Sequence, residues 1–179
     1  MKKLNRRSLL LFLPAVLVFL DQLTKVWARD VLKNRGEIIV IPDVLEFRYL
    51  ENRGAAWGML QGRLNILTVV TVILLILFLW LLFRVPEGKR YLPVYLVFLF
   101  IISGAIGNLI DRIWFDYVTD FIYFSLINFP IFNVADIYVT CSVFVLVILV
   151  LLYYSDEELS FLPLFGSKKS KDNPDESPS

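Results

Sequence analysis

The stretch Tyr91–Ile110, YLPVYLVFLFIISGAIGNLI, contains no charged residue and is followed at once by Asp111 and Arg112. An α-helix needs about 17–25 apolar residues to cross the hydrocarbon layer of a bilayer. This run therefore predicts a transmembrane helix with a carboxylate at its end. A charge so close to hydrocarbon costs free energy, which makes it a candidate for a functional role.

Two further uncharged runs, residues 64–83 and 137–155, are also long enough to span a membrane, and a shorter run covers residues 8–20. The chain is 58% hydrophobic, above the about 45–50% of soluble domains. We therefore predict an all-α membrane protein with four transmembrane helices, at about residues 8–26, 64–83, 91–111 and 137–155. Residues 1–155 are expected to form one integral membrane domain, and the polar residues 156–179 a disordered cytoplasmic tail.

Basic residues cluster near both ends of the chain and between the second and third predicted helices. Cytoplasmic loops carry an excess of Lys and Arg, so both termini are expected in the cytoplasm and the carboxylates outside. The first outer loop is also partly basic, but there the basic residues are mixed with acidic ones. The residues that set the orientation are Lys2, Lys3, Arg6, Arg7, Arg84, Lys89, Arg90, Lys168, Lys169 and Lys171.

The loop between the first two helices predicts a small extracytoplasmic β-sheet. Residues 37–41 and 44–50 have the composition of two short strands around a turn at Pro42-Asp43. Apolar and charged residues alternate from Leu45 to Tyr49, which fits a sheet on the membrane surface and equally an ordinary surface hairpin. The aromatic segment 112–133 is expected at the membrane interface, where aromatic rings are enriched.

Four aspartates gather on the outer side of these helices, at positions 111, 116, 120 and 136. The chain has no histidine, so it cannot form a Ser-His or Cys-His system or a His-based zinc site. Two aspartates that share one proton need neither. The sequence therefore favours acid–base chemistry by a carboxylate pair.

The preferred pair is Asp120 with Asp136. Asp120 lies in an apolar setting, where burial raises the pKa of a carboxyl group, as suits an acid that holds a proton. Asp111 is followed by Arg112, whose charge would keep that carboxylate ionised. Asp111 with Asp136 remains the rival pair.

Amides precede two of the carboxylates by three residues, as Asn108 precedes Asp111 and Asn133 precedes Asp136. On a helix this spacing places both side chains on one face. Asn133 also has the position of a helix N-cap, so a structural role competes with a functional one. The stretch from Ser103 to Gly107 is rich in small residues and predicts close packing of two helix backbones.

Three further features are weaker. Asp21 and Lys25 have i, i+4 spacing, which fits a local ion pair and equally a support for the site from a third element. Asn52 offers an amide, and Gly54 allows an unusual turn. Cys141, the only cysteine, is expected to be a buried hydrophobe.

In order along the chain, five motifs resemble the lipoprotein signal peptidase (signal peptidase II) family. They are Asp21-Gln22-Leu23-Thr24-Lys25, Asn52-Arg53-Gly54-Ala55-Ala56, Gly104-Ala105-Ile106-Gly107-Asn108-Leu109-Ile110-Asp111-Arg112, Val118-Thr119-Asp120-Phe121 and Phe132-Asn133-Val134-Ala135-Asp136. The resemblance covers about residues 8–155. The chain departs from the family pattern at Ser103, Thr119 and Ile137, where Gly, Val and Ser respectively are usual.

The resemblance implies an aspartic endopeptidase of the bacterial cytoplasmic (inner) membrane that needs no metal or cofactor. It would cleave diacylglyceryl-modified prolipoproteins just before the lipid-bearing cysteine. Its partners would be these substrates and membrane lipids, with no nucleic acid, and the protein is expected to be a monomer. Asp120 and Asp136 map onto the catalytic pair. The substrate-binding and supporting residues would be Asp21, Lys25, Asn52, Gly54, Asn108, Asp111, Arg112 and Asn133.

Two other classes of protein compete with a peptidase. A small transporter would use intramembrane Asp and Lys residues as a proton or ion path, but the charges here cluster at one surface. A non-catalytic assembly factor would use the small-residue helix as its docking face.

Overall fold

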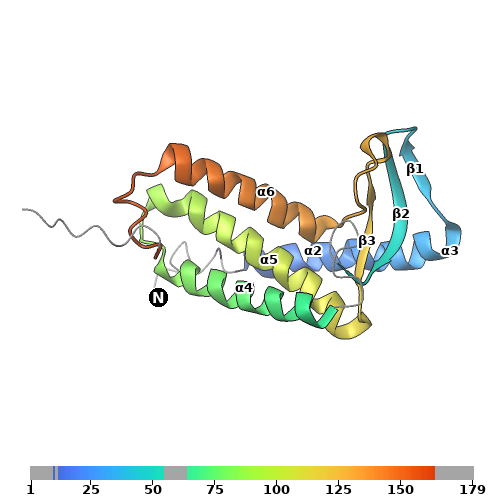
Figure 1. Ribbon diagram of the computed structural model, residues 1–179, viewed down its shortest axis with the longest axis horizontal. Helices are drawn as coiled ribbons and strands as arrows, with labels where there is room; N and C mark the ends of the chain where they lie inside the picture. Colours follow the sequence, from blue (N-terminus) through green and yellow to red (C-terminus); the bar gives the residue numbers. More distant parts are fainter. Residues whose placement is uncertain (1–9, 11, 55–63, 164–179) are drawn as a thin grey trace, which may run out of the picture.

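The computed structural model describes residues 10, 12–54 and 64–163. A helical bundle carries a small sheet at one end (Figure 1). The elements are α2 (Leu13–Trp27), the π-helical η1 (Ala28–Leu32), α3 (Lys33–Arg35), β1 (Ile38–Ile41), β2 (Leu45–Asn52), α4 (Leu64–Arg84), the 3-10 turn η3 (Lys89–Tyr91), α5 (Leu92–Phe115), β3 (Val118–Tyr123), the 3-10 turn η4 (Ser125–Ile127), α6 (Val134–Ile148) and the π-helical η5 (Leu149–Tyr153).

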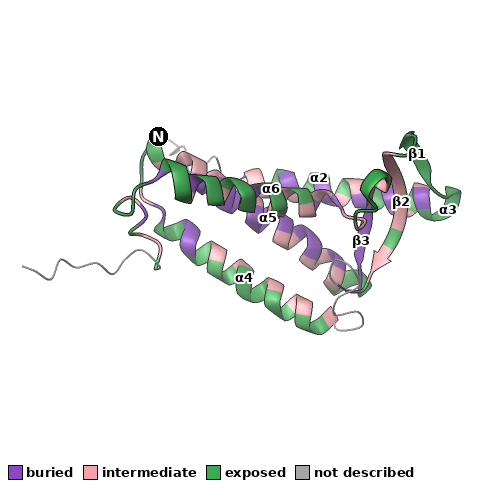
Figure 2. Ribbon diagram, turned by 45° about the horizontal axis from the view of Figure 1, so that its top comes forward, coloured by how far each residue is buried: buried purple, intermediate pink, exposed green. Residues whose placement is uncertain are grey.

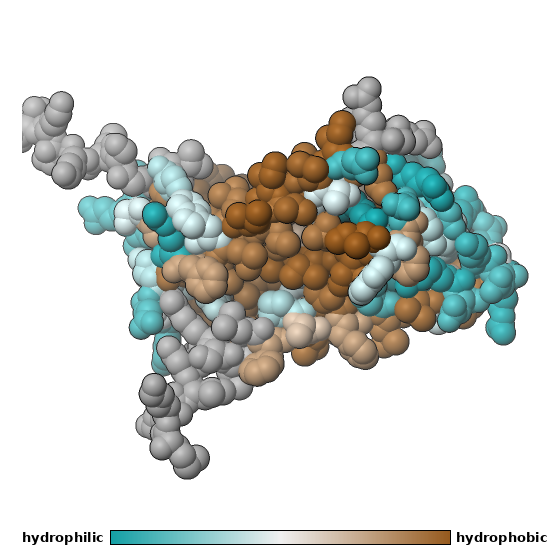
Figure 3. Space-filling view, turned by 90° about the horizontal axis from the view of Figure 1, so that it is seen from below, coloured by the Kyte–Doolittle hydropathy of each residue, from teal (hydrophilic) through white to brown (hydrophobic). Residues whose placement is uncertain are grey.

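Among the described residues, three helical segments are long and apolar enough to cross a membrane: Leu64–Arg84, Lys89–Phe115 and Val134–Tyr153. They correspond to three of the four predicted spans. The remaining helix, α2, has 15 residues and carries Asp21 and Lys25. A broad apolar surface with hydrophilic surface at both ends is seen in Figure 3, which is the distribution expected of a protein that sits in a bilayer.

The centre of the bundle is α5, which packs against α2, α4 and α6. Half of its residues are buried, whereas α4 is largely exposed (Figure 2). The small-residue stretch allows this packing. A Cβ atom on Gly104 would lie 2.5 Å from the carbonyl oxygen of Ala135, and one on Gly107 would lie 2.5 Å from Asp21 Oδ2. Both glycines therefore permit the close approach that the sequence predicted.

The sheet has three antiparallel strands in the order β1-β2-β3. Strands β1 and β2 match the two predicted strands. The third strand, β3, was not predicted, because the segment 112–133 was expected only to lie at the membrane interface. Leu50 pairs with Asp120 and Asn52 with Val118, so β3 places Asp120 beside the end of β2.

An aromatic cluster joins the sheet to the helix that precedes it. The rings of Trp27 and Phe47 lie 5.5 Å apart, and those of Trp27 and Phe121 lie 6.0 Å apart. Ala28 and Leu32 of η1 are buried against the same cluster. Apolar contacts of β2 and β3 therefore hold the sheet against η1.

Two expectations need correction. Cys141 is exposed, not buried, because it lies on the side of α6 that borders an open pocket. Residues 156–163, which were placed in a disordered tail, form turns in which Leu159 is buried and Glu158 contacts Arg90 Nε at 2.8 Å. The basic clusters at residues 2–7 and 168–171, the motif residues Ala55 and Ala56, and the rest of the tail, residues 164–179, lie outside the described residues.

Candidate active site

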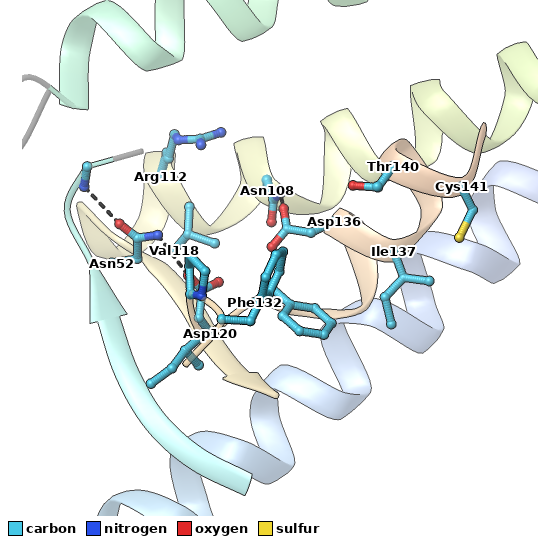
Figure 4. Close-up of a pocket in the computed structure, with 14 residues that line it drawn as sticks. Asn52, Asn108, Arg112, Val118, Asp120, Phe132, Asp136, Ile137, Thr140 and Cys141 are labelled. Carbon is cyan, nitrogen blue, oxygen red and sulfur yellow. Dashed lines mark hydrogen bonds between the residues drawn. The ribbon is translucent and has the colours of Figure 1, made fainter. Parts of the chain in front are cut away.

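A pocket of about 560 Å³ opens where the sheet meets α5 and α6 (Figure 4). One wall comes from the ends of β2 and β3, another from α5, and the third from α6 and the loop before it. Asp120 and Asp136 are the carboxylates that line it. The lining residues are Asn52, Gly54, Asn108, Arg112, Val118, Asp120, Phe129, Pro130, Ile131, Phe132, Asp136, Ile137, Thr140 and Cys141.

Asp120 reaches the pocket from β3 and is held by two amides. Asn52 Nδ2 donates to its Oδ2 across 2.8 Å, and Asn133 Nδ2 donates to its Oδ1 across 2.6 Å. Only 2% of Asp120 is exposed. This burial, together with the neighbouring negative charge of Asp136, raises the pKa of Asp120 to about 7. Near neutral pH this carboxyl group can therefore hold or release a proton.

Asp136 lies in the first turn of α6 and forms a capping box with Asn133. The backbone N–H of Asn133 donates to Asp136 Oδ2 across 3.1 Å, and Asn108 Nδ2 donates to Oδ1 across 2.8 Å. Asn133 thus caps the helix and also holds Asp120. The structural and the functional interpretations of this residue are both compatible with its contacts.

A buried ion pair lies behind the two carboxylates. Lys25 Nζ is 3.0 Å from Asp21 Oδ2 and donates to Asn108 Oδ1 across 2.9 Å. Asp21 Oδ1 accepts a hydrogen bond from the backbone N–H of Ala135 across 2.9 Å. Since the side chains of Asp21 and Lys25 are fully buried, the pair is not a surface ion pair. It connects α2 to the residues that hold the pocket.

The other two aspartates do not line the pocket. Asp111 is fully buried behind it, where it accepts a hydrogen bond from the Thr119 backbone N–H across 2.8 Å and lies 3.5 Å from Lys25 Nζ. Arg112 faces the pocket and donates to Thr71 Oγ1 across 3.3 Å, and its charge also acts on Asp111, as the sequence predicted. Asp116 is the exposed, left-handed C-cap of α5.

Three residues of the buried network were not proposed from the sequence. Gln22 Nε2 donates to Gly107 O across 3.0 Å and to Asp111 Oδ1 across 3.3 Å. Arg29 and Thr119 contact each other and Asp111. Arg29 follows Lys25 by four residues, so helical spacing was the available signal for it.

A second groove of about 300 Å³ runs between α4, α5 and α6 and is mainly apolar. It shares four residues with the main pocket, namely Asn108, Arg112, Asp136 and Thr140. The groove therefore lies next to the pocket, on the side of Asp136 that faces α4 and α5. Within the described part of the chain, no three His, Cys, Asp or Glu residues are grouped so that they could hold a metal ion.

Comparison with known proteins gives a consistent result. Residues 13–152 match the family model described as signal peptidase (SPase) II. The chain is 42% identical over 137 residues to the lipoprotein signal peptidase of Clostridium tetani, covering 75% of this chain and 86% of that protein. It is 34% identical over 143 residues to that of Streptococcus agalactiae, covering 80% and 92%.

Two solved structures of bacterial membrane enzymes are also similar. One has a TM-score of 0.68 at 28% identity, covering 91% of this chain and 93% of that one. The other has a TM-score of 0.69 at 32% identity, covering 80% and 93%.

Proposed function

Since this chain belongs to the signal peptidase II family, we propose that its reaction, the removal of signal peptides from prolipoproteins, is carried out by Asp120 and Asp136. The observation that carries this proposal is the shared amide of Asn133. Its side chain donates to Asp120, and its backbone N–H donates to Asp136. Both carboxylates line one pocket, so they can act on the same peptide bond.

The chemistry is that of an aspartic protease. The pair shares one proton near neutral pH, because burial and the neighbouring charge raise the pKa of Asp120. The ionised carboxylate takes a proton from a water molecule, whose oxygen attacks the scissile carbonyl carbon. The protonated partner donates its proton to the carbonyl oxygen. The C–N bond then breaks as the leaving amine takes the proton that the first carboxylate drew from water. The second carboxylate takes back its proton from the hydroxyl group of the intermediate, and no acyl-enzyme forms.

The amides and Arg112 orient the reacting groups. Asn52, Asn108 and Asn133 each place an N–H donor on a carboxylate. Asn52 Oδ1 in turn accepts the Gly54 N–H across 3.0 Å, which fixes the direction of that amide. The Nε of Arg112 is buried and has no partner among the described residues, and its guanidinium borders both the pocket and the groove, where it can hold a substrate carbonyl.

We place the protein in the bacterial inner membrane with four spanning helices. The sequence of α2 supports a fourth span only if residues before it extend the helix. The connection between α4 and α5 lies at the end of the bundle away from the sheet (Figure 1), and it is basic: Arg84 ends α4, and Lys89 and Arg90 begin η3. By the excess of basic residues in cytoplasmic loops, that end and both termini are inside, and the pocket faces outward.

The substrate is a prolipoprotein that carries a diacylglyceryl group on the cysteine after the cleaved bond. The apolar groove between α4, α5 and α6 borders the pocket at Asp136 and can hold part of the acyl chains, the rest of which stay in the lipid. Each methylene that leaves water contributes about 0.8 kcal/mol to binding. The lipid thus both anchors the substrate and sets which peptide bond reaches the carboxylates.

The test compares one prolipoprotein with and without its diacylglyceryl group, using purified protein in the same detergent. We expect cleavage of the modified form before its cysteine, and far slower cleavage of the unmodified form. Equal rates would show that the lipid is not recognised. The transporter alternative is not supported, because the matching family and the named relatives are peptidases. A non-catalytic assembly factor would cleave neither substrate.

A further inference from the structure

Arg29 connects three parts of the molecule near the pocket without lining it. Its Nη1 donates to Thr119 Oγ1 across 2.8 Å and lies 3.8 Å from Asp111 Oδ1. Its guanidinium carbon lies 4.5 Å from the centre of the Phe115 ring. The side chain is 15% exposed. Arg29 of η1 thus contacts β3 at Thr119 and the C-terminal part of α5 at Asp111 and Phe115.

The residue that Arg29 holds is the direct neighbour of Asp120. Thr119 is fully buried, and its backbone N–H donates to Asp111 Oδ2 across 2.8 Å. Successive residues of a strand point to opposite faces. Thr119 therefore faces Arg29 and Asp111, while Asp120 faces the pocket. Strand β3 is therefore held at Thr119, on the face away from the pocket. Asp120, the next residue, carries its carboxylate on the face toward the pocket.

Charge and shape both favour Arg at this position. The buried network contains two carboxylates, Asp21 and Asp111, and two cations, Lys25 and Arg29. Lys25 already contacts both carboxylates and Asn108. The planar guanidinium can donate to Thr119 and at the same time stack on Phe115, a combination that the ammonium of a lysine cannot reproduce.

We propose that Arg29, acting through the hydroxyl group of Thr119, is a positioning residue for Asp120. The proposal rests on the catalytic role proposed above for Asp120. It predicts a loss in the chemical step and not in substrate binding, because Arg29 does not border the pocket or the groove. A displacement of a reacting group by about 1 Å can cost on the order of 100-fold in rate.

The experiment is a double-mutant cycle on the purified full-length protein with a diacylglyceryl-modified prolipoprotein. Arg29→Gln and Thr119→Val are each expected to lower kcat at least about 10-fold and to leave KM within about twofold. The double variant is expected to be no slower than the slower single variant, because both changes break the same hydrogen bond. Arg29→Lys should restore less than half of the lost kcat.

Arg35→Gln is the matched control, because it makes the same change of residue type at a second arginine. Arg35 is exposed at the end of α3 and lines neither the pocket nor the groove. Its kcat should stay within about twofold of wild type. If Arg29→Gln does not fold, Thr119→Val decides the case, since it keeps the shape of the side chain and the charge of Arg29.

An unchanged kcat in folded Arg29→Gln or in Thr119→Val overturns the positioning role, and so do losses that add in the double variant. A rise in KM with unchanged kcat also overturns it, because Arg29 would then act on substrate binding. Asp120→Asn is measured in parallel. If Asp120→Asn retains turnover, the proposed function is wrong. If Asp120→Asn is inactive and Arg29→Gln is fully active, only the positioning role is wrong.

Discussion

Asn133 Nδ2 donates to Asp120 Oδ1 across 2.6 Å, while the backbone N–H of the same asparagine donates to Asp136 Oδ2. The side-chain oxygen of Asn133 accepts the N–H of Asp136 across 3.0 Å and so caps α6. One residue therefore begins the helix that carries one carboxylate and holds the carboxylate on the opposite wall. Helix stability and site geometry can be separated by substitution here.

We expect Asn133→Ser to keep the helix cap and lose the amide donor. Serine is as good an N-cap as asparagine, whereas Asn133→Ala should cost about 0.5–2 kcal/mol of stability. Both variants lose the hydrogen bond to Asp120, so both should lose at least about 10-fold in kcat. Thermal unfolding and turnover are measured for each, with exposed Asn65→Ser as the control. A fully active Asn133→Ser would show that the amide does not serve the reaction.

The raised pKa of Asp120 predicts a dependence of stability on pH. Burial and Asp136 raise this pKa from 3.8 to about 7. The folded protein therefore keeps a proton that the unfolded chain releases, so this contribution to stability is present below about pH 4 and is lost as the pH rises through 7. We expect the unfolding temperature of wild type to fall more steeply over this range than that of Asp120→Asn. Parallel curves for the two proteins would contradict the shift.

Asp111→Asn is expected to weaken the fold more than the chemistry. Asp111 is fully buried between Lys25 and Arg29. Breaking such a pair costs about 3–5 kcal/mol, because a buried charge loses its partner. The folded fraction should still cleave substrate, which a turnover assay on protein purified by size exclusion can measure. A folded but inactive Asp111→Asn beside an active Asp120→Asn would transfer the catalytic role to Asp111.

Gly104→Ala should separate α5 from α6. The added Cβ would lie 2.5 Å from the carbonyl oxygen of Ala135 and 2.7 Å from a methyl group of Val139. Backbone cannot give way as a flexible side chain can, so overpacking of about 1–3 kcal/mol is expected. The unfolding temperature should fall relative to Ala105→Ser, a change of similar size at the next residue. An unchanged value would mean that the two helices do not pack as described.

Much of the fold follows from charge and apolar length. The runs that became α4, α5 and α6 are uncharged over as many residues as a bilayer requires, so their helices could be predicted. Strand β3 could not, because aspartate is rare in strands and Asp120 stands in its middle. Asp120 is tolerated there because amides from β2 and from the start of α6 meet it.

The carboxylates of the pocket could be predicted, because a charge near hydrocarbon costs free energy. The partners of the buried charges could not, because they come from distant parts of the chain. Asp120 and Asp136 were proposed because a carboxylate near hydrocarbon costs free energy and is usually functional. For Asp111 the sequence indicated only its neighbour Arg112, whose charge does act on it. Its ion-pair partners, Lys25 and Arg29, stand about 80 residues earlier in the chain and were not predicted. Such contacts depend on how α2 packs against α5, which no local pattern shows.

The central claim is that Asp120 and Asp136 together perform the cleavage. The most direct test measures single-turnover cleavage of a diacylglyceryl-modified prolipoprotein by purified, folded Asp120→Asn and Asp136→Asn. Asp116→Asn is the matched control, because Asp116 is exposed and lies outside the pocket. General acid–base catalysis contributes about 10²–10⁴-fold in rate, so we predict a loss of at least this size in both variants and none in the control. Near-wild-type cleavage by either Asp120→Asn or Asp136→Asn would contradict the account.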